Sequence, residues 1–466
     1  MKKIQSIREK SRIPLNGQEE EMRKRSCMAA ALMLGLALSA CAGPSAGGPV
    51  NSGGQNGEAA DKPDTMDTTD TVAPDAGSDY AATDNTAGSA EAEGEQSGVI
   101  PEVSEQNWKE AYLEFLDDYL YNEIGLTPGD DEGWSCGFIY VNDDDIPEMV
   151  IDSGFEAAGR MIVTYAGGKA QALQNSRMGF LYVPRGNVID NADGIMGYNY
   201  HYFYTIDPEE GFVLKDGGTY TEIVNEETGV SEGFEYAWND ETVTKEEFEK
   251  NIADNISAKD SLSFYCGTRI DSVRAYLSES GPKDFKEAYM DLYNSGFVSG
   301  FSDGSFPAYA VLDTKDSDPM LLASSQSSFS LCCFEDGLLT VGPEWYVSSY
   351  ETALMLPDER GFMTFGSYAD ESYFNSVYEV GDGCLKGRYY AQQVRYDENG
   401  EFMTDQNGDP VYDYLINNLP VDKKEYLELL DRYEDVFKIE YTPYDADQTY
   451  LDYISGDALE HELSSR

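Results

Sequence analysis

The chain has 466 residues, enough for two or three ordinary domains with a sizeable core. Its 32 Lys and Arg residues face 87 Asp and Glu residues, and the formal net charge of −55 argues against nucleic acid as a partner, because binding a phosphate backbone requires clustered cations. Only two histidines occur, His201 and His461, which disfavours metal-hydrolase chemistry.

The first predicted element is an export signal. Residues 23–25 are Arg-Lys-Arg, and an apolar run from Met28 to Ala40 follows. A helix that crosses a bilayer needs about 20 apolar residues, so this shorter run predicts a signal peptide. The residues before Met22 are charged and unlike the start of such a signal, which indicates that translation begins at Met22.

The signal ends in Leu38-Ser39-Ala40-Cys41, which resembles the lipobox of bacterial lipoproteins. The resemblance implies that a diacylglyceryl group is added to the Cys41 thiol and that a peptidase cuts before this cysteine. We therefore assign residues 1–41 to the signal peptide with its lipobox. The resemblance places the protein at the extracellular face of the cell membrane, with the membrane as a partner through this lipid.

A linker is predicted next, over residues 42–100. It consists mainly of Gly, Ala, Ser, Thr, Asp and Glu, and Tyr80 is its only aromatic residue. Such a composition cannot bury a core, and its negative charges repel one another. The segment is therefore expected to be a disordered acidic tether between the lipid and the folded part.

The folded part contains a diverged internal repeat. Residues 108–112 (WKEAY) match residues 285–289 (FKEAY), and apolar residues recur at helical spacing in both, as in Trp108, Ala111, Tyr112, Phe115 and Tyr119. Each match predicts an amphipathic helix. Apolar runs broken by turns follow each helix and predict antiparallel strands, at 138–141, 161–165 and 200–206 in one copy and at 309–312, 329–334 and 373–380 in the other.

A second helix is predicted at the end of each copy, at residues 243–248 and 421–426. Thr244 with Glu247, and Asp422 with Glu425, have the spacing of a capping box. We therefore predict an α+β fold of two tandem diverged repeats, at residues 101–280 and 281–466, each an antiparallel β meander flanked by helices. The two units could also pack as one body.

An acidic turn in the first copy is the candidate metal site. Residues 142–148 (NDDDIPE) resemble the calcium loops of repeats in which Asp and Asn residues precede Pro-Glu, and closely spaced hard oxygen ligands are what Ca²⁺ requires. The candidate ligands are Asn142, Asp144, Asp145 and Glu148. In the second copy Asp313, Asp316 and Asp318 remain, but Met320 takes the place of Glu148. A solvated acidic turn is the favoured alternative, because a run of charges usually marks a wet surface.

The remaining motifs favour structural roles. Residues 300–304 (GFSDG) fit the G-x-S-x-G pattern of serine hydrolases, but the strand, elbow and helix that this pattern requires are missing, so a loop is expected. Asn-Gly pairs at 399–400 and 407–408 predict hairpin turns. His201 lies in an aromatic strand and is expected to be structural. Five cysteines follow the leader without a CxxC pair, which predicts buried free thiols.

No pattern of nucleophile and base is present, so the sequence predicts a non-catalytic protein rather than an enzyme. The chain resembles repeat-containing surface lipoproteins of Gram-positive anaerobes, and its 34 tyrosines suit both sheets and sugar-stacking sites. The leading hypothesis is a binding or adhesion module for an extracellular polysaccharide, peptide or wall component. The alternatives are the solute-binding subunit of an importer, which should show alternating βα units, and a secreted hydrolase.

Overall fold

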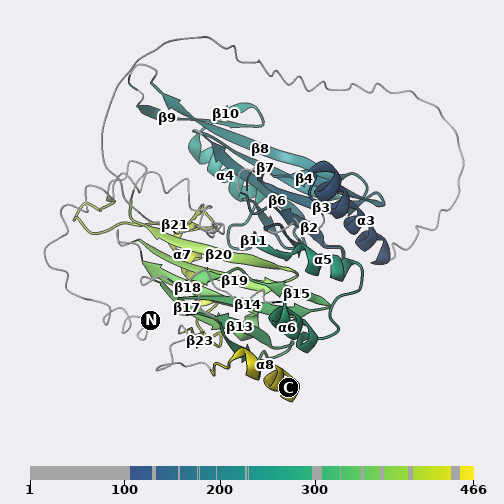
Figure 1. Cartoon of the computed structure of the whole chain (residues 1–466). Coiled ribbons are helices and arrows are strands. Elements are labelled where there is room, and N and C mark those ends of the chain that lie inside the picture. The colour runs from purple at the N-terminus through teal and green to yellow at the C-terminus, as the bar shows by residue number, and fades with distance from the viewer. Residues whose placement is uncertain are drawn as a thin grey trace, which may run out of the picture. The chain divides into compact units, whose positions relative to one another are not determined.

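The computed structural model describes residues 105–127, 133–155, 158–175, 177, 179–195, 197–225, 228, 230–295, 307–325, 327–347, 351–367, 372–396, 402–441 and 452–466. They belong to one compact unit that runs from Ser104 to Arg466. The described part forms 23 strands and six α-helices, and every strand pair is antiparallel (Figure 1). The signal peptide, the lipobox with Cys41 and the linker at 42–100 lie outside the described residues and stay predictions.

The first meander is covered by the first helix. Helix α3 (Glu105–Asp117) continues into a π-helical turn, η1 (Asp118–Glu123). Four strands follow, each antiparallel to the next: β1 (Ser135–Ile139), β2 (Glu148–Asp152), β3 (Arg160–Ala166) and β4 (Lys169–Gln174). Helix α3 and η1 pack on this sheet through residues spaced four apart: Trp108, Tyr112 and Leu116 of α3 and Leu120 of η1.

The second meander is longer. It consists of β5 (Leu181–Val183), β6 (Val188–Ile195), β7 (Tyr198–Asp207), β8 (Gly211–Val224), β9 (Ser231–Trp238) and β10 (Glu241–Val243). Helix α4 (Lys245–Asn255) follows and begins at a capping box between Thr244 and Glu247, as the sequence predicts. Phe248 and Ile252 of α4 pack in one cluster with Phe203 and Trp238 of the meander.

Strand β11 (Leu262–Arg269) joins the sheets of the two halves of the chain. It pairs with β1 and β5 and also with β20 (Cys384–Val394), which lies more than 100 residues further along. Helix α5 (Ile270–Leu277) follows and packs with α3 through Val273 and Leu277.

A separate five-stranded sheet comes next. Helix α6 (Phe285–Asn294) precedes its strands, which are β12 (Ala308–Leu312), β13 (Met320–Ser324), β14 (Ser328–Glu335), β15 (Leu338–Val341) and β16 (Trp345–Tyr346). Tyr289 and Leu292 of α6 pack on this sheet together with Leu459 and Leu463 of the C-terminal helix α8 (Gly456–Ser465).

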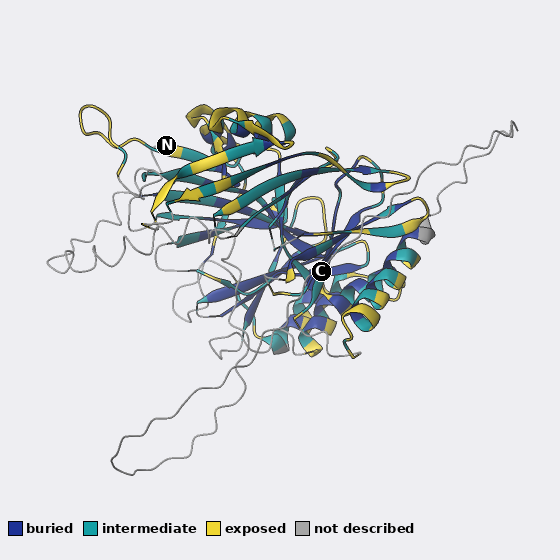
Figure 2. Ribbon diagram, turned by 90° about the horizontal axis from the view of Figure 1, so that it is seen from above, coloured by how far each residue is buried: buried dark blue, intermediate teal, exposed yellow. Residues whose placement is uncertain are grey.

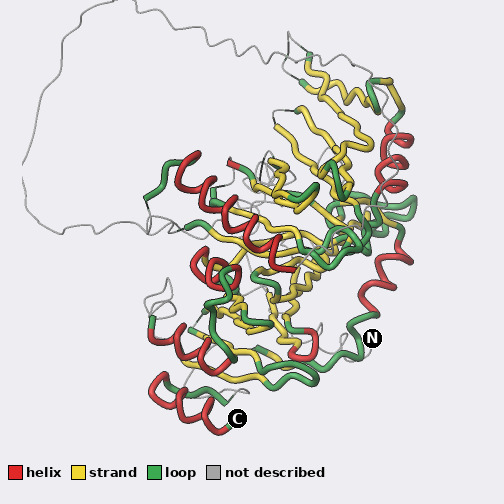
Figure 3. The backbone as a smooth tube through the Cα atoms, turned by 90° about the vertical axis from the view of Figure 1, so that its right-hand side faces the viewer, coloured by secondary structure: helices red, strands yellow, loops and turns green. Residues whose placement is uncertain are grey.

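The last meander completes the large sheet. It contains β17 (Glu351–Leu356), the 3₁₀ turn η3 (Pro357–Glu359), β18 (Gly361–Ser367), β19 (Tyr373–Gly381), β20, β21 (Asp413–Ile416) and β22 (Leu419–Val421), and β23 (Ile439–Glu440) pairs with β17. Helix α7 (Lys423–Asp431) buries Tyr426 and Leu429 in the same cluster that holds Phe248 of α4. Buried strands fill the centre and the helices lie on the outside (Figures 2 and 3).

The predicted fold class is wrong. Instead of two tandem helix-flanked α+β meanders, the described part is mostly antiparallel sheet, and 18 of its strands form one hydrogen-bonded network. Strand β11 connects the two halves within this network, and α4 and α7 share one core. Alternation along the sequence predicts that a strand forms, but packing decides which distant strand pairs with it. The boundary between 280 and 281 stays a prediction.

Several local predictions are confirmed. The strands and closing helices lie within a few residues of their expected positions, and Asp422 caps α7 by accepting a hydrogen bond from the Glu425 backbone N–H. Four of the five cysteines are buried free thiols, and Cys266 is a half-buried one. The Asn-Gly pair at 407–408 lies in a turn between the antiparallel bridged residues Thr404 and Pro410, with Gly408 at φ 84°. Left-handed hairpin turns also occur at Asn239-Asp240 (φ 48° and 65°) and Asn417-Asn418 (φ 52° and 64°).

Candidate binding site

The acidic turn between β1 and β2 uses its polar groups within the fold. The Asn142 side chain donates a hydrogen bond to Asp144 Oδ2 (2.7 Å), and the Ile146 backbone N–H donates to Asp144 Oδ1 (2.9 Å). Arg185 donates to the Asp144 carbonyl (3.0 Å), and its guanidinium lies 3.8 Å from a carboxylate oxygen of Asp145. These contacts are those of a folded turn that a neighbouring arginine partly neutralises.

Glu148 lies in a different environment from the rest of the turn. Its side chain is buried, with 1% of the residue exposed, and it accepts hydrogen bonds from the Val141 backbone N–H (2.8 Å) and the Thr164 hydroxyl (3.2 Å). Burial raises its pKa to about 8, and the nearby charge of Asp144 adds to this effect. Asp145, by contrast, is fully exposed.

The four candidate calcium ligands are therefore only partly brought together. Asn142 and Asp144 are in contact, whereas Glu148 is buried in the sheet and Asp145 points into solvent. Within the described ranges, no group of three or more His, Cys, Asp or Glu side chains is arranged to hold a metal ion. Calcium binding stays a prediction. The G-x-S-x-G segment at 300–304 and the turn at 397–400 lie outside the described residues.

A more open arrangement of side chains lies on β7. Tyr198, Tyr200 and Tyr202 alternate along this strand, so they lie on one face of the sheet. Their rings form a row, with centroids 6.3 Å apart for the first pair and 4.9 Å apart for the second, which is stacked. Tyr198 is 39% exposed, and the other two are half-buried. We call these three residues the tyrosine strip.

One end of the strip leads into the core. Tyr204, the next residue on the same face, packs against the cluster that contains Ile189 and Ile206. The face of β7 thus changes from core to open surface between Tyr204 and Tyr198. The pKa of Tyr202 is raised to about 12, first by a hydrogen bond with Tyr198 and then by burial, so Tyr202 is uncharged at physiological pH.

Polar groups flank the strip on both neighbouring strands. On β6 the residues opposite Tyr202 and Tyr200 are Asn191 and Asp193, and on β8 they are Gly217 and Thr219. Side chains of directly opposite residues share a face of the sheet. Asn191 is buried, with 5% of the residue exposed, so the accessible polar groups beside the rings are the half-buried side chains of Asp193 and Thr219.

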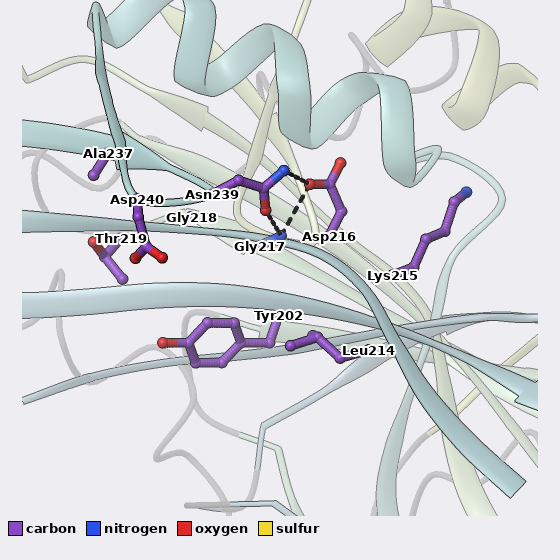
Figure 4. A pocket seen from close by; sticks show the side chains of 10 residues that line it. All are labelled: Tyr202, Leu214, Lys215, Asp216, Gly217, Gly218, Thr219, Ala237, Asn239 and Asp240. Carbon is purple, nitrogen blue, oxygen red and sulfur yellow. Dashed lines mark hydrogen bonds between the residues drawn. The ribbon is translucent and has the colours of Figure 1, made fainter. Parts of the chain in front are cut away.

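A shallow pocket of about 350 Å³ adjoins the strip at Tyr202 (Figure 4). It lies between β7, β8 and the turn that joins β9 to β10, and its lining residues are Tyr202, Leu214, Lys215, Asp216, Gly217, Gly218, Thr219, Ala237, Asn239 and Asp240. In Figure 4 the Tyr202 ring and Leu214 lie on one side of the β8 backbone, and the Asp216 carboxylate lies on the other.

Asp216 holds the pocket wall in place. Its carboxylate accepts hydrogen bonds from the side chains of Trp238 (2.9 Å), Asn239 (2.6 Å) and Asn255 (3.1 Å) and from the Gly217 backbone N–H (3.1 Å). Burial on its own would raise the pKa of Asp216, but these four donors lower it below its usual value. The charged carboxylate thus ties together β8, the β9–β10 turn and the end of α4.

The opposite face of these strands is closely packed. The Phe248 ring of α4 lies 5.4–5.6 Å from the rings of Tyr220, Tyr236 and Trp238. A Cβ atom on Gly218 would overlap the Trp238 ring and come within 2.7 Å of Phe248, so a glycine is required there. The tyrosine strip is therefore the open side of a sheet whose other side is a rigid aromatic core.

His201 belongs to that packed side, because it alternates with Tyr200 and Tyr202. Its Nδ1 lies 2.9 Å from Asp190 Oδ2, and its ring stacks on Phe203. The expected structural role of this histidine agrees with these contacts. The strip itself offers rings and hydroxyls beside the carboxylate of Asp193, which suit binding. Tyrosines alternate along the sequence from residue 198 to residue 204, and this pattern could have indicated the tyrosine strip. From the sequence we predicted only an aromatic strand there.

Comparisons with known proteins do not assign this chain to a family. No protein-family model matches it, and no curated protein matches it. Among solved structures, it is weakly similar to a protein of Bacteroides fragilis described provisionally as a 6-phosphogluconolactonase, with 9% sequence identity and a TM-score of 0.14 over 68% of this chain and 98% of that one. A TM-score this low supports no conclusion about the fold or the activity of this protein.

Proposed function

We propose that the protein is a lipid-anchored extracellular surface protein that binds a polysaccharide through the tyrosine strip without acting on it chemically. Lipid on Cys41 holds it at the outer face of the cell membrane, and residues 42–100 separate the binding part from the lipid. The lipobox residues 38–41 support the anchoring. No helix in the described ranges is long and apolar enough to cross a membrane.

The stacked tyrosines with their polar flanks are the observation that carries the binding proposal. One face of a pyranose ring is made of C–H groups, which pack on an aromatic ring, while its hydroxyls need hydrogen-bonding partners at the edge. Tyr200 and Tyr202 supply the rings, and the half-buried Asp193 and Thr219 flank them. The rigid aromatic packing beneath the strip means that little conformational entropy is lost on binding.

The other functions considered from the sequence have less support. A solute-binding subunit of an importer should contain alternating βα units, whereas the strand pairs in the described part are antiparallel and connected as meanders. A hydrolase needs a base beside a reactive group, and His201 is on the packed side of its sheet with Asp190. A peptide or wall component remains a second ligand class for the same strip.

Removing two of the rings tests the binding proposal. The mature chain, residues 41–466 carrying Cys41→Ser, has neither the apolar leader nor the lipid, and it is screened on an array of plant, fungal and bacterial polysaccharides. We expect at least one of them to bind, and the double variant Tyr200→Ala/Tyr202→Ala to bind at least about tenfold more weakly.

Tyr346→Ala is the matched control, because Tyr346 is 46% exposed on the distant strand β16. It should leave the affinity unchanged. Failure of the parent chain to bind any polysaccharide, or equal binding by the double variant at an unchanged melting temperature, would contradict the proposal.

Mass spectrometry of the native protein tests the anchoring separately. We expect residues before Cys41 to be absent and a diacylglyceryl group to be present on this cysteine. Replacement of Cys41 by Ser should leave the leader attached and the chain without lipid, because the peptidase cuts before the modified cysteine. An unmodified thiol on a chain that keeps its leader would rule out the lipid anchor.

A further inference from the structure

We propose that the outer end of the β8–β9 hairpin, residues 222–225 and 230–235, takes an extended cationic peptide segment of another protein as an added strand beside β9. We call these residues the hairpin end. It contains none of the three tyrosines of the strip, so binding there goes beyond the proposed function. The features that carry it are the open edge of β9, the exposed apolar side chains of the hairpin end and its charge.

Strand β9 is paired fully on its inner side but only in part on its outer side. On the inner side it pairs with β8 from Ser231 to Trp238. On the outer side β10 pairs only with Tyr236, Ala237 and Trp238, after which the chain leaves the sheet for α4. No other described strand pairs with residues 231–235, and β9 and β10 lie at the margin of the sheet (Figure 1). The outward backbone groups of these residues can therefore pair with an added strand.

Large apolar side chains are exposed on both faces of the hairpin end. Ile223, Val224, Val230 and Phe234 are 42–61% exposed. By alternation Val224 and Phe234 share the face of Tyr220, and Ile223 lies on the opposite face. Only one side of the Phe234 ring is covered, by the Tyr220 ring at 5.7 Å between centroids. Grouped exposure of large apolar side chains is typical of a surface that contacts a partner.

The charge of this hairpin favours a cationic partner. Residues 216–243 contain eight Asp and Glu residues and no Lys, Arg or His, and Lys215 and Lys245 lie just outside them. Within the described residues, Glu232 accepts a hydrogen bond from a neutral amide (2.7 Å), and neither it nor Glu235 forms an ion pair. Lys or Arg side chains of a strand beside β9 would thus pair with carboxylates that have no cation of their own.

The positions of these side chains also indicate the sequence pattern of the partner. Phe234 and Glu235 are consecutive residues of β9, so they lie on opposite faces of the sheet. A strand placed beside them matches both if its apolar residues lie on one face and its cations on the other. The partner segment therefore alternates apolar residues with Lys or Arg.

A second copy of this chain does not fit the same edge. A symmetrical pair of β9 edges would bring Glu232 and Glu235 of both copies into one short strand pair. Like charges across neighbouring strands destabilise their pairing, and each chain has a formal net charge of −55. Charge complementarity thus favours a cationic segment over a second copy.

Titration calorimetry with designed peptides tests the proposal. The mature chain, residues 41–466 carrying Cys41→Ser, is titrated with capped peptides about seven residues long in which Val alternates with Lys, with Ser or with Glu, and with one in which Lys alternates with Ser. We expect the Lys-Val peptide to bind at least about tenfold more tightly than the others, and more weakly at high salt. Equal binding of the Lys-Ser peptide, or preference for either peptide without Lys, would overturn the proposal.

Methylation of the peptide backbone tests strand addition. The N–H groups of alternate residues in a strand point to opposite edges, so only one alternate set of them can face β9. The Lys-Val peptide is made in two N-methylated forms, one methylated on its Lys residues and one on its Val residues. We expect one form to bind at least about tenfold more weakly and the other to bind like the parent peptide. Equal affinities of the two forms would contradict strand addition.

Charge reversal on β9 locates the site. Glu232→Lys/Glu235→Lys should weaken binding of the Lys-Val peptide at least about tenfold, because cations then face the ligand. The matched control is Glu209→Lys/Glu210→Lys, which changes the net charge equally at the exposed turn between β7 and β8 and should keep the affinity within about twofold. Equal weakening by both variants would assign the binding to the net charge of the protein and not to the hairpin end.

Hydrogen exchange maps the contact without any substitution. The Lys-Val peptide should slow the exchange of backbone amides in residues 231–235 and leave residues 236–238, which already pair with β10, unchanged. Protection along β7 and not along β9 would overturn the proposal. Tyr200→Ala/Tyr202→Ala should bind the peptide with the parent affinity, so this proposal and polysaccharide binding can fail separately.

Sedimentation of the mature chain tests for self-association at the same edge. We expect a monomer at all concentrations at which the peptide binds. A dimer in which residues 231–235 are protected from exchange would make a second copy the occupant and overturn the cationic partner.

Discussion

The acidic turn at 142–148 and the tyrosine strip on β7 both lie next to buried strands. Their polar groups have different roles. In the turn, the carboxylates of Asp144 and Glu148 accept hydrogen bonds from their own neighbours in the chain or the sheet. In the strip, the packed face supplies the stability, and the rings of Tyr198 and Tyr202 remain at the surface.

This difference shows that a segment rich in carboxylate and amide oxygens does not by that composition form a metal site. Carboxylate and amide oxygens that accept hydrogen bonds within a turn do not converge on a common metal position. Their hydrogen-bonding capacity is used for folding. The tyrosine side chains of the strip are not needed to complete a turn of the backbone. They form a surface only because α4 stabilises their strand from the other side.

The largest effect is expected from removing that support. Phe248→Ala deletes a buried ring that contacts the rings of Tyr220, Tyr236 and Trp238, and the resulting cavity should cost about 3–5 kcal/mol. Polysaccharide binding should weaken with it, since the strip loses its backing. Thermal unfolding monitored by circular dichroism is the measurement, with the exposed Phe437→Ala as control. A loss below about 1 kcal/mol would show that the strip does not depend on α4.

The next largest effect concerns the pH dependence of stability that Glu148, at the end of the acidic turn, contributes. Glu148 has its folded pKa raised to about 8, above the unfolded value, so its contribution to stability is fully present below the unfolded pKa and is lost as pH rises through about 8. Relative to the parent chain, Glu148→Gln should therefore gain roughly 4 kcal/mol of stability between about pH 5 and about pH 9. Melting temperatures across this range measure it, and parallel pH curves for the two proteins would contradict it.

A smaller effect is expected at the pocket wall. Asp216→Ala removes the acceptor for Trp238, Asn239 and Asn255 and should cost about 1–2 kcal/mol. Because the folded pKa of Asp216 is lowered, the stability that it contributes is present above its unfolded pKa and is lost as pH falls. The difference between parent and variant should thus shrink in acid. A constant difference from neutral pH down to about pH 3 would assign the loss to packing instead.

The smallest effect concerns calcium at the acidic turn. Because Asn142, Asp144 and Glu148 have partners in the fold, we expect the melting temperature to be the same with excess Ca²⁺ as with EDTA. Differential scanning calorimetry of the full chain measures this. A rise in the melting temperature with Ca²⁺ that disappears in Asp144→Asn would restore the turn as a metal site.

The sequence by itself determined the local elements, because these depend on short-range patterns. Helical spacing located the helices at 108 and 285, and Thr244 with Glu247 marked the start of α4. The buried face of α3 and η1 was predicted less well: Leu116 and Leu120 are fully buried, whereas Phe115 and Tyr119 are only partly so. The lipobox at 38–41 is likewise a short-range pattern, and it stays a prediction about export.

Only the tertiary structure decided how the elements combine. Alternating residues in β11 indicate a strand equally well whether its partner is β1, β5 or β20, and the pairing with all three made one large sheet where two separate meanders were expected. Packing likewise selected the more open face of β7, because Phe248 packs with His201 and Phe203 on one face, whereas Tyr198 on the other face is 39% exposed. A local pattern specifies two faces of a strand, and contacts between distant segments specify which of them meets solvent.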